Sequence, residues 1–269
     1  MAKPRKRPAL VAATSSDPNY MLSLARGLTV IRAFENSESA LSVAEVARRS
    51  GISRAAARRC LHTLACLDYV VSAAGKFELA PKVLTLGYAY LGSARVSRAA
   101  QPVLERVSER LQESCSMSVM DGNEIVYVAR AASRRIVSIS LSTGSRLPAY
   151  CTSMGRILLA FGGEERLKQY FAAVKPVAHT PHTIIKRADL LEEFERIRAA
   201  GYALVDQELE IGLRSVAVPV RRADSSVVAA INVGVQAARV DCKTMVSTYV
   251  PVLQKAAGEI GIAIGHTIG

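Results

Sequence analysis

The sequence of 269 residues lacks the cysteine patterns that would cross-link a small domain or bind a metal. Its five cysteines are scattered, with no C-x-x-C pair and no Cys/His spacing of a zinc site. An odd, dispersed set of cysteines is typical of reduced thiols, which predicts a cytoplasmic protein. We therefore expect neither a disulfide framework nor a metal site, and no cofactor.

Long apolar runs are also missing. The longest stretch without a charged residue covers residues 225–238, which is too short to cross a bilayer and indicates a buried strand. The N-terminal residues lack the apolar core of a signal peptide, and their KPRKRP cluster at residues 3–8 predicts a disordered basic arm. We expect no membrane partner.

Fingerprints of catalysis are absent too. The sequence contains no G-x-S-x-G nucleophile elbow, no P-loop and no G-x-G-x-x-G dinucleotide motif. His179 and His182 flank a proline in a predicted loop, and no neighbouring carboxylate pattern makes them a site. We predict that the protein is not an enzyme.

Acidic residues are scarce in the first third of the chain. Residues 1–100 hold 15 Lys/Arg against 6 Asp/Glu, whereas residues 101–269 hold 20 against 17. Most of the net charge of +12 therefore lies in one region. A localised basic excess is the electrostatic signature of a nucleic-acid-binding domain.

Residues 41–79 within that basic third predict a helix, a tight turn, a second helix and a hairpin. Ser42 with Glu45 forms a capping-box pattern at the start of the first helix. Gly51 suits a left-handed position at its end, and Ser53 is a second N-cap before a helix that begins at Arg54 and extends to about Tyr69.

The second of these helices is predicted to have one cationic and one apolar face. At about 100° per residue from Arg54, Arg58 falls near 40° and Arg59 near 140°, while the apolar residues fall between about 220° and 340°. A DNA-recognition helix needs this arrangement, although a solvated amphipathic helix would share it. The capped helix before it and the hairpin after it favour a winged helix-turn-helix. The predicted DNA-binding residues are Ser53, Arg54, Ala55, Arg58, Arg59, Thr63, the hairpin residue Lys76, and Arg26.

The pattern along the whole chain predicts an α+β protein. We expect a disordered arm at residues 1–20, a winged domain at 21–82, a linker helix at 83–99 that pairs two copies, and an effector-binding domain at 100–269. In the last of these we predict a helix at 103–115, strands at 116–120, 124–129, 136–141, 202–205, 215–220 and 227–234, and helices at 154–161, 164–171, 190–200 and about 244–264. The hairpinned strands indicate a largely antiparallel sheet.

Several motifs resemble those of the IclR family of bacterial transcription regulators. They are SLARGLTVIRAF at residues 23–34, VAEVARRSGISRAAARRCLHTL at 43–64, RLPAYCTSMGRILLA at 146–160 and VDQELEIGLRSVAVPV at 205–220. The resemblance implies a winged helix-turn-helix, a linker helix and a GAF/profilin-like effector domain, in dimers or tetramers. The RLPAYCTSMGR motif looks like the branch that regulates aromatic-acid catabolism, the PcaU, PcaR and PobR type. Those regulators respond to protocatechuate, 4-hydroxybenzoate, β-ketoadipate or close relatives.

A pocket for such an acid is predicted around residues 150–156. A helix N-terminus favours anions, hydroxyls can donate, and Tyr150 could stack on a ring. Buried small residues at a helix cap are the alternative reading. Arg134 or Arg135 would hold a carboxylate, or else lie solvated at a strand end. By resemblance, ligand positions map onto Asp206, Ser215 and Asn232. The predicted effector-binding residues are Arg134, Tyr150, Cys151, Thr152, Ser153, Met154, Gly155, Asp206, Ser215 and Asn232.

The sequence therefore predicts a ligand-responsive, DNA-binding transcription regulator of aromatic-compound catabolism. Its expected partners are double-stranded operator DNA, a small carboxylic acid and further copies of itself, as a homodimer or dimer of dimers, with RNA polymerase as a further candidate. The competing hypothesis is a stand-alone small-acid-binding protein or enzyme whose basic N-terminus is incidental.

Overall fold

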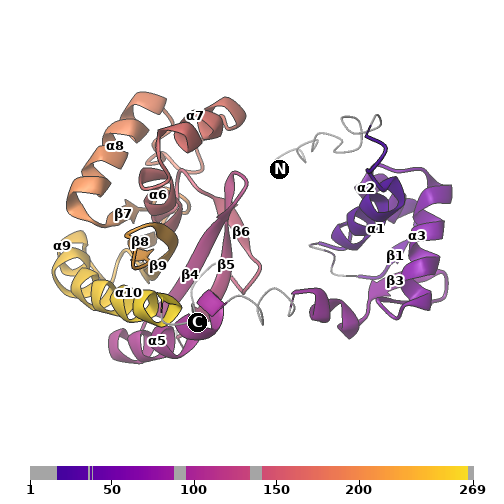
Figure 1. Ribbon diagram of the computed structural model, residues 1–269, viewed down its shortest axis with the longest axis horizontal. Coiled ribbons are helices and arrows are strands. Elements are labelled where there is room, and N and C mark those ends of the chain that lie inside the picture. Colours follow the sequence, from indigo (N-terminus) through magenta and orange to yellow (C-terminus); the bar gives the residue numbers. More distant parts are fainter. Residues whose placement is uncertain (1–16, 36, 38, 88–94, 134–140, 266–269) are drawn as a thin grey trace. The chain divides into compact units, whose positions relative to one another are not determined.

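The computed structural model in Figure 1 describes residues 17–35, 37, 39–87, 95–133 and 141–265. Its backbone contacts fall into two units, Met1–Tyr90 and Leu91–Gly269. Each unit has its own hydrophobic core, so each is described by itself. No helix in the described part of the chain is long and apolar enough to span a membrane.

The smaller unit is a bundle of helices followed by a hairpin. Its elements are α1 (Leu22–Arg32), β1 (Leu41–Ser42), α2 (Val43–Ser50), α3 (Arg54–Cys66), β2 (Val70–Ala73), β3 (Lys76–Leu79) and the 3-10 turn η1 (Pro81–Val83). The strands pair antiparallel in the order β1-β3-β2. Side chains from all three helices, including Val30, Val46 and Leu61, fill the core. This is the predicted winged helix-turn-helix.

The helix ends of this unit form as the sequence predicts. The Ser42 N–H donates to Glu45 Oε2 at 2.9 Å while Ser42 Oγ accepts from the Glu45 N–H at 3.3 Å, which completes a capping box. Gly51 adopts φ +71°, and Ser53 Oγ caps α3. The helix α3 ends at Cys66 rather than near Tyr69, because Asp68 takes a left-handed conformation and the chain turns into β2.

The larger unit contains a six-stranded antiparallel sheet. Its strands follow the order β6-β5-β4-β9-β8-β7. They are β4 (Ser114–Asp121), β5 (Glu124–Ala131), β6 (Arg146–Pro148), β7 (Ala203–Asp206), β8 (Leu213–Arg221) and β9 (Val227–Gln236). The helices are α5 (Arg95–Leu111), α6 (Ser153–Ala160), α7 (Glu164–Ala173), α8 (Arg187–Ala200), α9 (Cys242–Thr244) and α10 (Val250–Gly265), and the π-helical turn η2 (Met245–Tyr249) joins the last two. This architecture confirms the predicted α+β class.

The sheet separates two cores. Figure 1 shows α5 and α10 on one side of the sheet and α6 and α8 on the other. Alternate side chains of a strand point to opposite faces. Val216, Val218 and Val220 of β8 therefore pack with α5 and α10, whereas Ala217 packs with α6 and α8. Both polar and apolar side chains on the α6 face line the candidate site.

Two predicted elements differ from the structure. The helix predicted at 103–115 is α5, which ends at Leu111 because Gln112 takes φ +56°, so Cys115 lies in β4. The short strand β6 was not predicted, and most of the strand predicted at 136–141 lies outside the described residues. Residues 84–87 are helical, and the rest of the predicted linker up to residue 94 is likewise outside them.

Candidate nucleic-acid interface and ligand pocket

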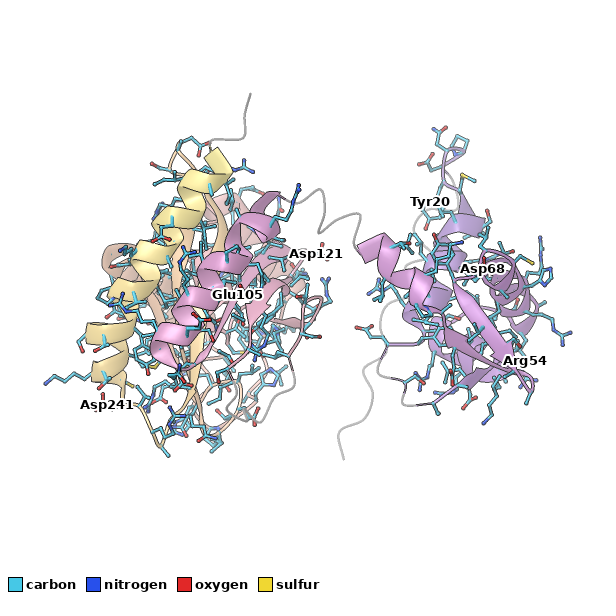
Figure 2. All side chains as sticks on the ribbon, turned by 90° about the horizontal axis from the view of Figure 1, so that it is seen from below. Tyr20, Arg54, Asp68, Glu105, Asp121 and Asp241 are labelled. Atoms are coloured by element: carbon cyan, nitrogen blue, oxygen red, sulfur yellow. The ribbon has the colours of Figure 1, made fainter. Side chains whose placement is uncertain are left out.

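The helix α3 presents a cationic surface on the smaller unit. Arg54, Arg58 and Arg59 are exposed, while Ala57 and Leu61 are buried on the opposite side. Figure 2 shows Arg54 at the outer surface of this unit. Within the described residues, none of the three arginines forms an ion pair with a carboxylate. Their charge therefore remains available to an external anion.

The other predicted DNA-binding residues are placed around this surface with one exception. Ser53, Ala55, Thr63 and Lys76 are exposed. The Thr63 hydroxyl donates to the Arg59 carbonyl at 3.0 Å, so its side chain is held along the helix. Arg26 on α1 differs, because it is half-buried and its Nε atom has no hydrogen-bond partner within the described residues.

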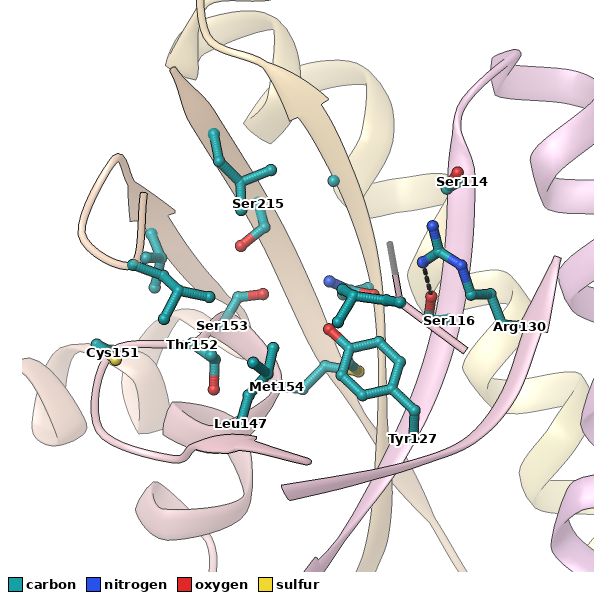
Figure 3. A pocket seen from close by; sticks show the side chains of 16 residues that line it. Ser114, Ser116, Tyr127, Arg130, Leu147, Cys151, Thr152, Ser153, Met154 and Ser215 are labelled. Atoms are coloured by element: carbon teal, nitrogen blue, oxygen red, sulfur yellow. Dashed lines mark hydrogen bonds between the residues drawn. The ribbon is translucent and has the colours of Figure 1, made fainter. Parts of the chain in front are cut away.

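A pocket lies on the α6 face of the large sheet. Residues from all six strands, from the start of α6 and from the segment between β7 and β8 line it. In Figure 3, Tyr127 and Arg130 stand on one side of the cavity, opposite Thr152, Ser153 and Ser215. The structure brings together six of the predicted effector residues here, namely Cys151, Thr152, Ser153, Met154, Ser215 and Asn232.

Three other predicted residues do not line this pocket. The Tyr150 hydroxyl donates to the Val177 carbonyl at 2.6 Å and accepts from its N–H at 3.1 Å, so Tyr150 anchors a loop instead of facing a ligand. A Cβ atom on Gly155 would lie 2.2 Å from the Ala149 carbonyl oxygen, so glycine permits this close approach. Arg134 lies outside the described residues.

Like Tyr150 and Gly155, Asp206 does not line the pocket, because it points away from the cavity. Its neighbour Val205 lines the pocket, and alternation turns Asp206 to the other face. There Arg214 Nε lies 2.8 Å from Asp206 Oδ1 and Nη2 lies 2.9 Å from Oδ2. The hydrogen bonds from Arg214 lower the pKa of Asp206 below its ordinary value. This carboxylate is therefore already bound by an internal cation.

The first turn of α6 faces the cavity without a side-chain cap. The N-cap is Thr152 rather than the predicted Ser153, and the Thr152 hydroxyl donates to the Pro148 carbonyl at 2.9 Å. Ser153 is 1% exposed, and its hydroxyl has no partner within the described residues. Burial raises the pKa of the Cys151 thiol to about 12, so this group is neutral. The turn offers hydrogen-bond donors and little charge.

A buried ion pair fixes the start of α6 to the segment after β7. Arg156 is 1% exposed, and its Nη2 atom lies 2.5 Å from Glu208 Oε2. Arg156 Nε also donates to the Tyr150 carbonyl at 2.8 Å, and Glu208 Oε2 accepts the N–H of Ile184 at 2.8 Å. The pair therefore holds together two segments that carry pocket residues.

Arg130 lines the pocket but was not predicted. It lies on β5, where its Nη1 atom donates to Ser116 Oγ of β4 at 2.9 Å (Figure 3). Burial lowers the pKa of this guanidinium below its ordinary value. The sequence signal was an arginine directly after the apolar run of residues 125–129, where the predicted strand ended two residues too early.

Comparison with known proteins identifies both units. Residues 23–73 match the IclR helix-turn-helix domain, and residues 88–262 match the bacterial transcriptional regulator IclR C-terminal domain. The chain is 44% identical to the Pca regulon regulatory protein of Pseudomonas putida over 97% of this chain and 89% of that protein. These matches are to regulators rather than enzymes, as predicted.

Two solved structures resemble the whole chain. A crystal structure described as a transcriptional regulator from Rhodococcus sp. RHA1 is 42% identical, with a TM-score of 0.83 over 93% of this chain and all of that one. An IclR homolog from Microbacterium hydrocarbonoxydans in complex with 4-hydroxybenzoate is 24% identical, with a TM-score of 0.79 over 90% of this chain and 98% of that one. The second comparison concerns the fold alone.

Proposed function

The chain belongs to the IclR family of bacterial transcriptional regulators, and on this premise we propose that it reads operator DNA through α3 and responds to a small acid bound on the α6 face of its large sheet. The observation that carries the proposal is the combination of an exposed cationic helix in one unit, whose arginines have no carboxylate partner among the described residues, with a pocket of polar and apolar side chains in the other. Ligand binding changes the placement of paired winged domains and so changes operator affinity or the contact with RNA polymerase.

The proposed DNA contacts are of two kinds, those that recognise bases and those that orient the domain on the phosphate backbone. Arg54, Arg58 and Arg59 reach base edges or phosphates in the major groove, and the small Ala55 side chain allows close approach. Ser53 and Thr63 support them. Lys76 at the start of β3 contacts a phosphate, as a wing residue can.

A homodimer is the assembly that we propose for DNA reading, because two-fold dimers read paired half-sites. Met21, Leu24 and Leu28 of the smaller unit are 51–66% exposed and recur at helical spacing. Leu84 and Leu86 of the predicted linker are exposed as well. A second copy of the chain would cover such apolar surface. Light scattering tests this by measuring the molar mass in solution. We expect a dimer for wild type and a weakened dimer for Leu28→Asp, and a wild-type chain with the mass of a monomer would contradict the proposal.

The effector that we propose is an aromatic or dicarboxylic acid of the protocatechuate, 4-hydroxybenzoate or β-ketoadipate type. The 44% identity to the Pca regulon regulatory protein and the resemblance to regulators of aromatic catabolism support this class. Hydroxyls of Thr152, Ser153 and Ser215, with the Asn232 amide, supply polar anchors, while Met154 supplies apolar wall.

An operator shift assay on the DNA upstream of its own gene tests the function. We expect a sequence-specific, salt-sensitive shift that Arg58→Ala weakens by about 1–3 kcal/mol at constant salt. Equal affinity of the variant would refute the assignment of α3. A wild-type chain without a specific shift would favour a stand-alone binding protein instead. A thermal-shift screen with the three acids tests the effector, because a ligand at ~100 times its Kd adds ~2.7 kcal/mol.

A further inference from the structure

An irregularity in β5 determines which face of the sheet Arg130 points to. Met117 pairs with Ala129 and Ser118 pairs with Tyr127, so Val128 between them has no partner on β4. This is a β-bulge, which inserts one extra residue and redirects the side chains that follow. Val128 and Ala129 both belong to the core under α5 and α10. In a regular strand, residues 127 and 130 would point to opposite faces, but here both line the pocket.

The redirected guanidinium has no anionic partner among the described residues. Its cross-strand neighbour Ser116 accepts one hydrogen bond from it, and the Arg130 backbone carbonyl accepts from Gln101 Nε2 of α5 at 3.2 Å. The hydroxyl of Ser116 replaces only part of the hydration that a half-buried cation loses, and it supplies no opposite charge.

The other shielded arginines of the larger unit make this absence informative. Arg156 pairs with Glu208 at 2.5 Å, Arg214 with Asp206 at 2.8 Å, and Arg146 with Glu124 at 2.9 Å. Arg198, also half-buried, pairs with Glu195. Within the described residues of this unit, Arg130 is thus the one shielded arginine without a carboxylate partner. It is also an arginine that lines a cavity.

We propose that Arg130 binds the carboxylate of the effector, with Ser116 fixing the orientation of the guanidinium. The inference rests on the proposed effector class and deepens it by naming the group that selects acids over neutral analogues. A guanidinium presents two parallel N–H donors that match the two oxygens of a carboxylate. The body of the ligand then extends toward Leu147 and Met154, which line the same cavity.

Calorimetric titration of the full-length chain tests this role. The probes are protocatechuate, 4-hydroxybenzoate and β-ketoadipate, each paired with its neutral amide. We expect wild type to prefer the acid, and Arg130→Met to lose at least about 30-fold in affinity for it, since removing one partner of a buried charge pair has at least that effect. The amide should bind both proteins alike, so the acid preference disappears in the variant.

Two further variants keep the result interpretable. Arg146→Met removes a half-buried arginine from β6, next to β5, that does not line the pocket, and should leave the acid affinity within about twofold. Arg130→Lys retains the positive charge but not the two parallel N–H donors of the guanidinium. Its affinity for the acid should therefore fall about tenfold, and its affinity for the amide should not change. It also serves as the test if Arg130→Met does not fold, which thermal unfolding reports.

The outcomes separate the inference from the proposed function. If a folded Arg130→Met or Arg130→Lys protein binds the acid as tightly as wild type, Arg130 is not the carboxylate site, while the acid effector stands. If wild type itself binds none of the three acids, the proposed effector class fails, and the role of Arg130 in binding it fails with it.

Discussion

The two units of this regulator use the same side chain in opposite ways. On α3, Arg54, Arg58 and Arg59 are exposed and have no described carboxylate partner. In the larger unit, shielded arginines such as Arg156 and Arg214 are bonded to internal carboxylates. Exposed cations act at a distance and are screened by salt, whereas buried pairs act at contact and are screened little.

This contrast separates partner binding from stability. The smaller unit keeps its positive charge for DNA, and its fold depends on caps and an apolar core. The larger unit uses charge to join segments around a pocket. Arg130 shares one property with each group. It is shielded from solvent like the paired arginines of the larger unit, and like the arginines of α3 it has no carboxylate partner among the described residues.

The largest expected effect comes from breaking a buried pair. Glu208→Gln leaves the buried Arg156 with only the more distant carboxylate of Glu193, whose Oε1 lies 3.8 Å from Nη1. We therefore expect the larger unit to lose about 3 kcal/mol in its free energy of unfolding, the lower end for a broken buried pair. Urea denaturation followed by circular dichroism measures this. The matched control is Glu259→Gln, which removes the partner of the exposed Arg106 and should not shift the transition measurably. Equal midpoints for the two variants would contradict the distinction between buried and exposed pairs.

Salt should affect the two units very differently. For a dimer with six phosphate contacts, raising the salt from 50 to 200 mM should weaken operator binding roughly 1,000-fold. Effector affinity in the shielded pocket should change only a few-fold over the same range. Fluorescence anisotropy and calorimetry measure the two affinities. A comparably steep salt dependence of both would mean that the pocket is as solvated as α3.

A substitution in the hairpin should change the salt dependence of DNA binding by a smaller amount. If Lys76 contacts a phosphate, Lys76→Ala should reduce the slope of log Kobs against log salt by about 1, with a similar loss on every operator sequence. Arg130→Met should leave this slope unchanged. An unaltered slope in Lys76→Ala would show that this lysine is only solvated.

Acid should weaken the paired charges of the larger unit. The Arg214 hydrogen bonds lower the folded-state pKa of Asp206 below its unfolded value of about 3.9. The stabilisation is therefore complete above that unfolded value and is lost as the pH falls through the lowered folded value. Asp206→Asn should be less stable than wild type at neutral pH, and the difference should shrink in strong acid. A difference independent of pH would exclude this origin.

Local signals allowed most elements to be predicted, and long-range placement limited the rest. The caps at Ser42 and Ser53 and the turn at Gly51 lie within a few residues of the helices that they end, so sequence reasoning found them. The loop anchor of Tyr150 depends on Val177, which is distant in the sequence. The partner of Asp206 is found only when β7 pairs with β8. Arg130 was missed because the strand was predicted to end at residue 129, and because a regular alternation of side chains does not anticipate the bulge that turns Arg130 to the cavity.

The bulge at Val128 lets two consecutive residues of β5, Val128 and Ala129, pack in one core without moving Arg130 from the cavity. Deleting Val128 would leave the Ser118–Tyr127, Met117–Ala129 and Ser116–Arg130 pairs in regular alternation, so Arg130 would still face the cavity. The deleted chain should therefore lose stability, because the core loses a buried side chain, and should keep acid binding. An Arg130→Ala chain should lose acid binding alone. The length of this strand can thus change how well the unit packs without changing the charge that its cavity presents.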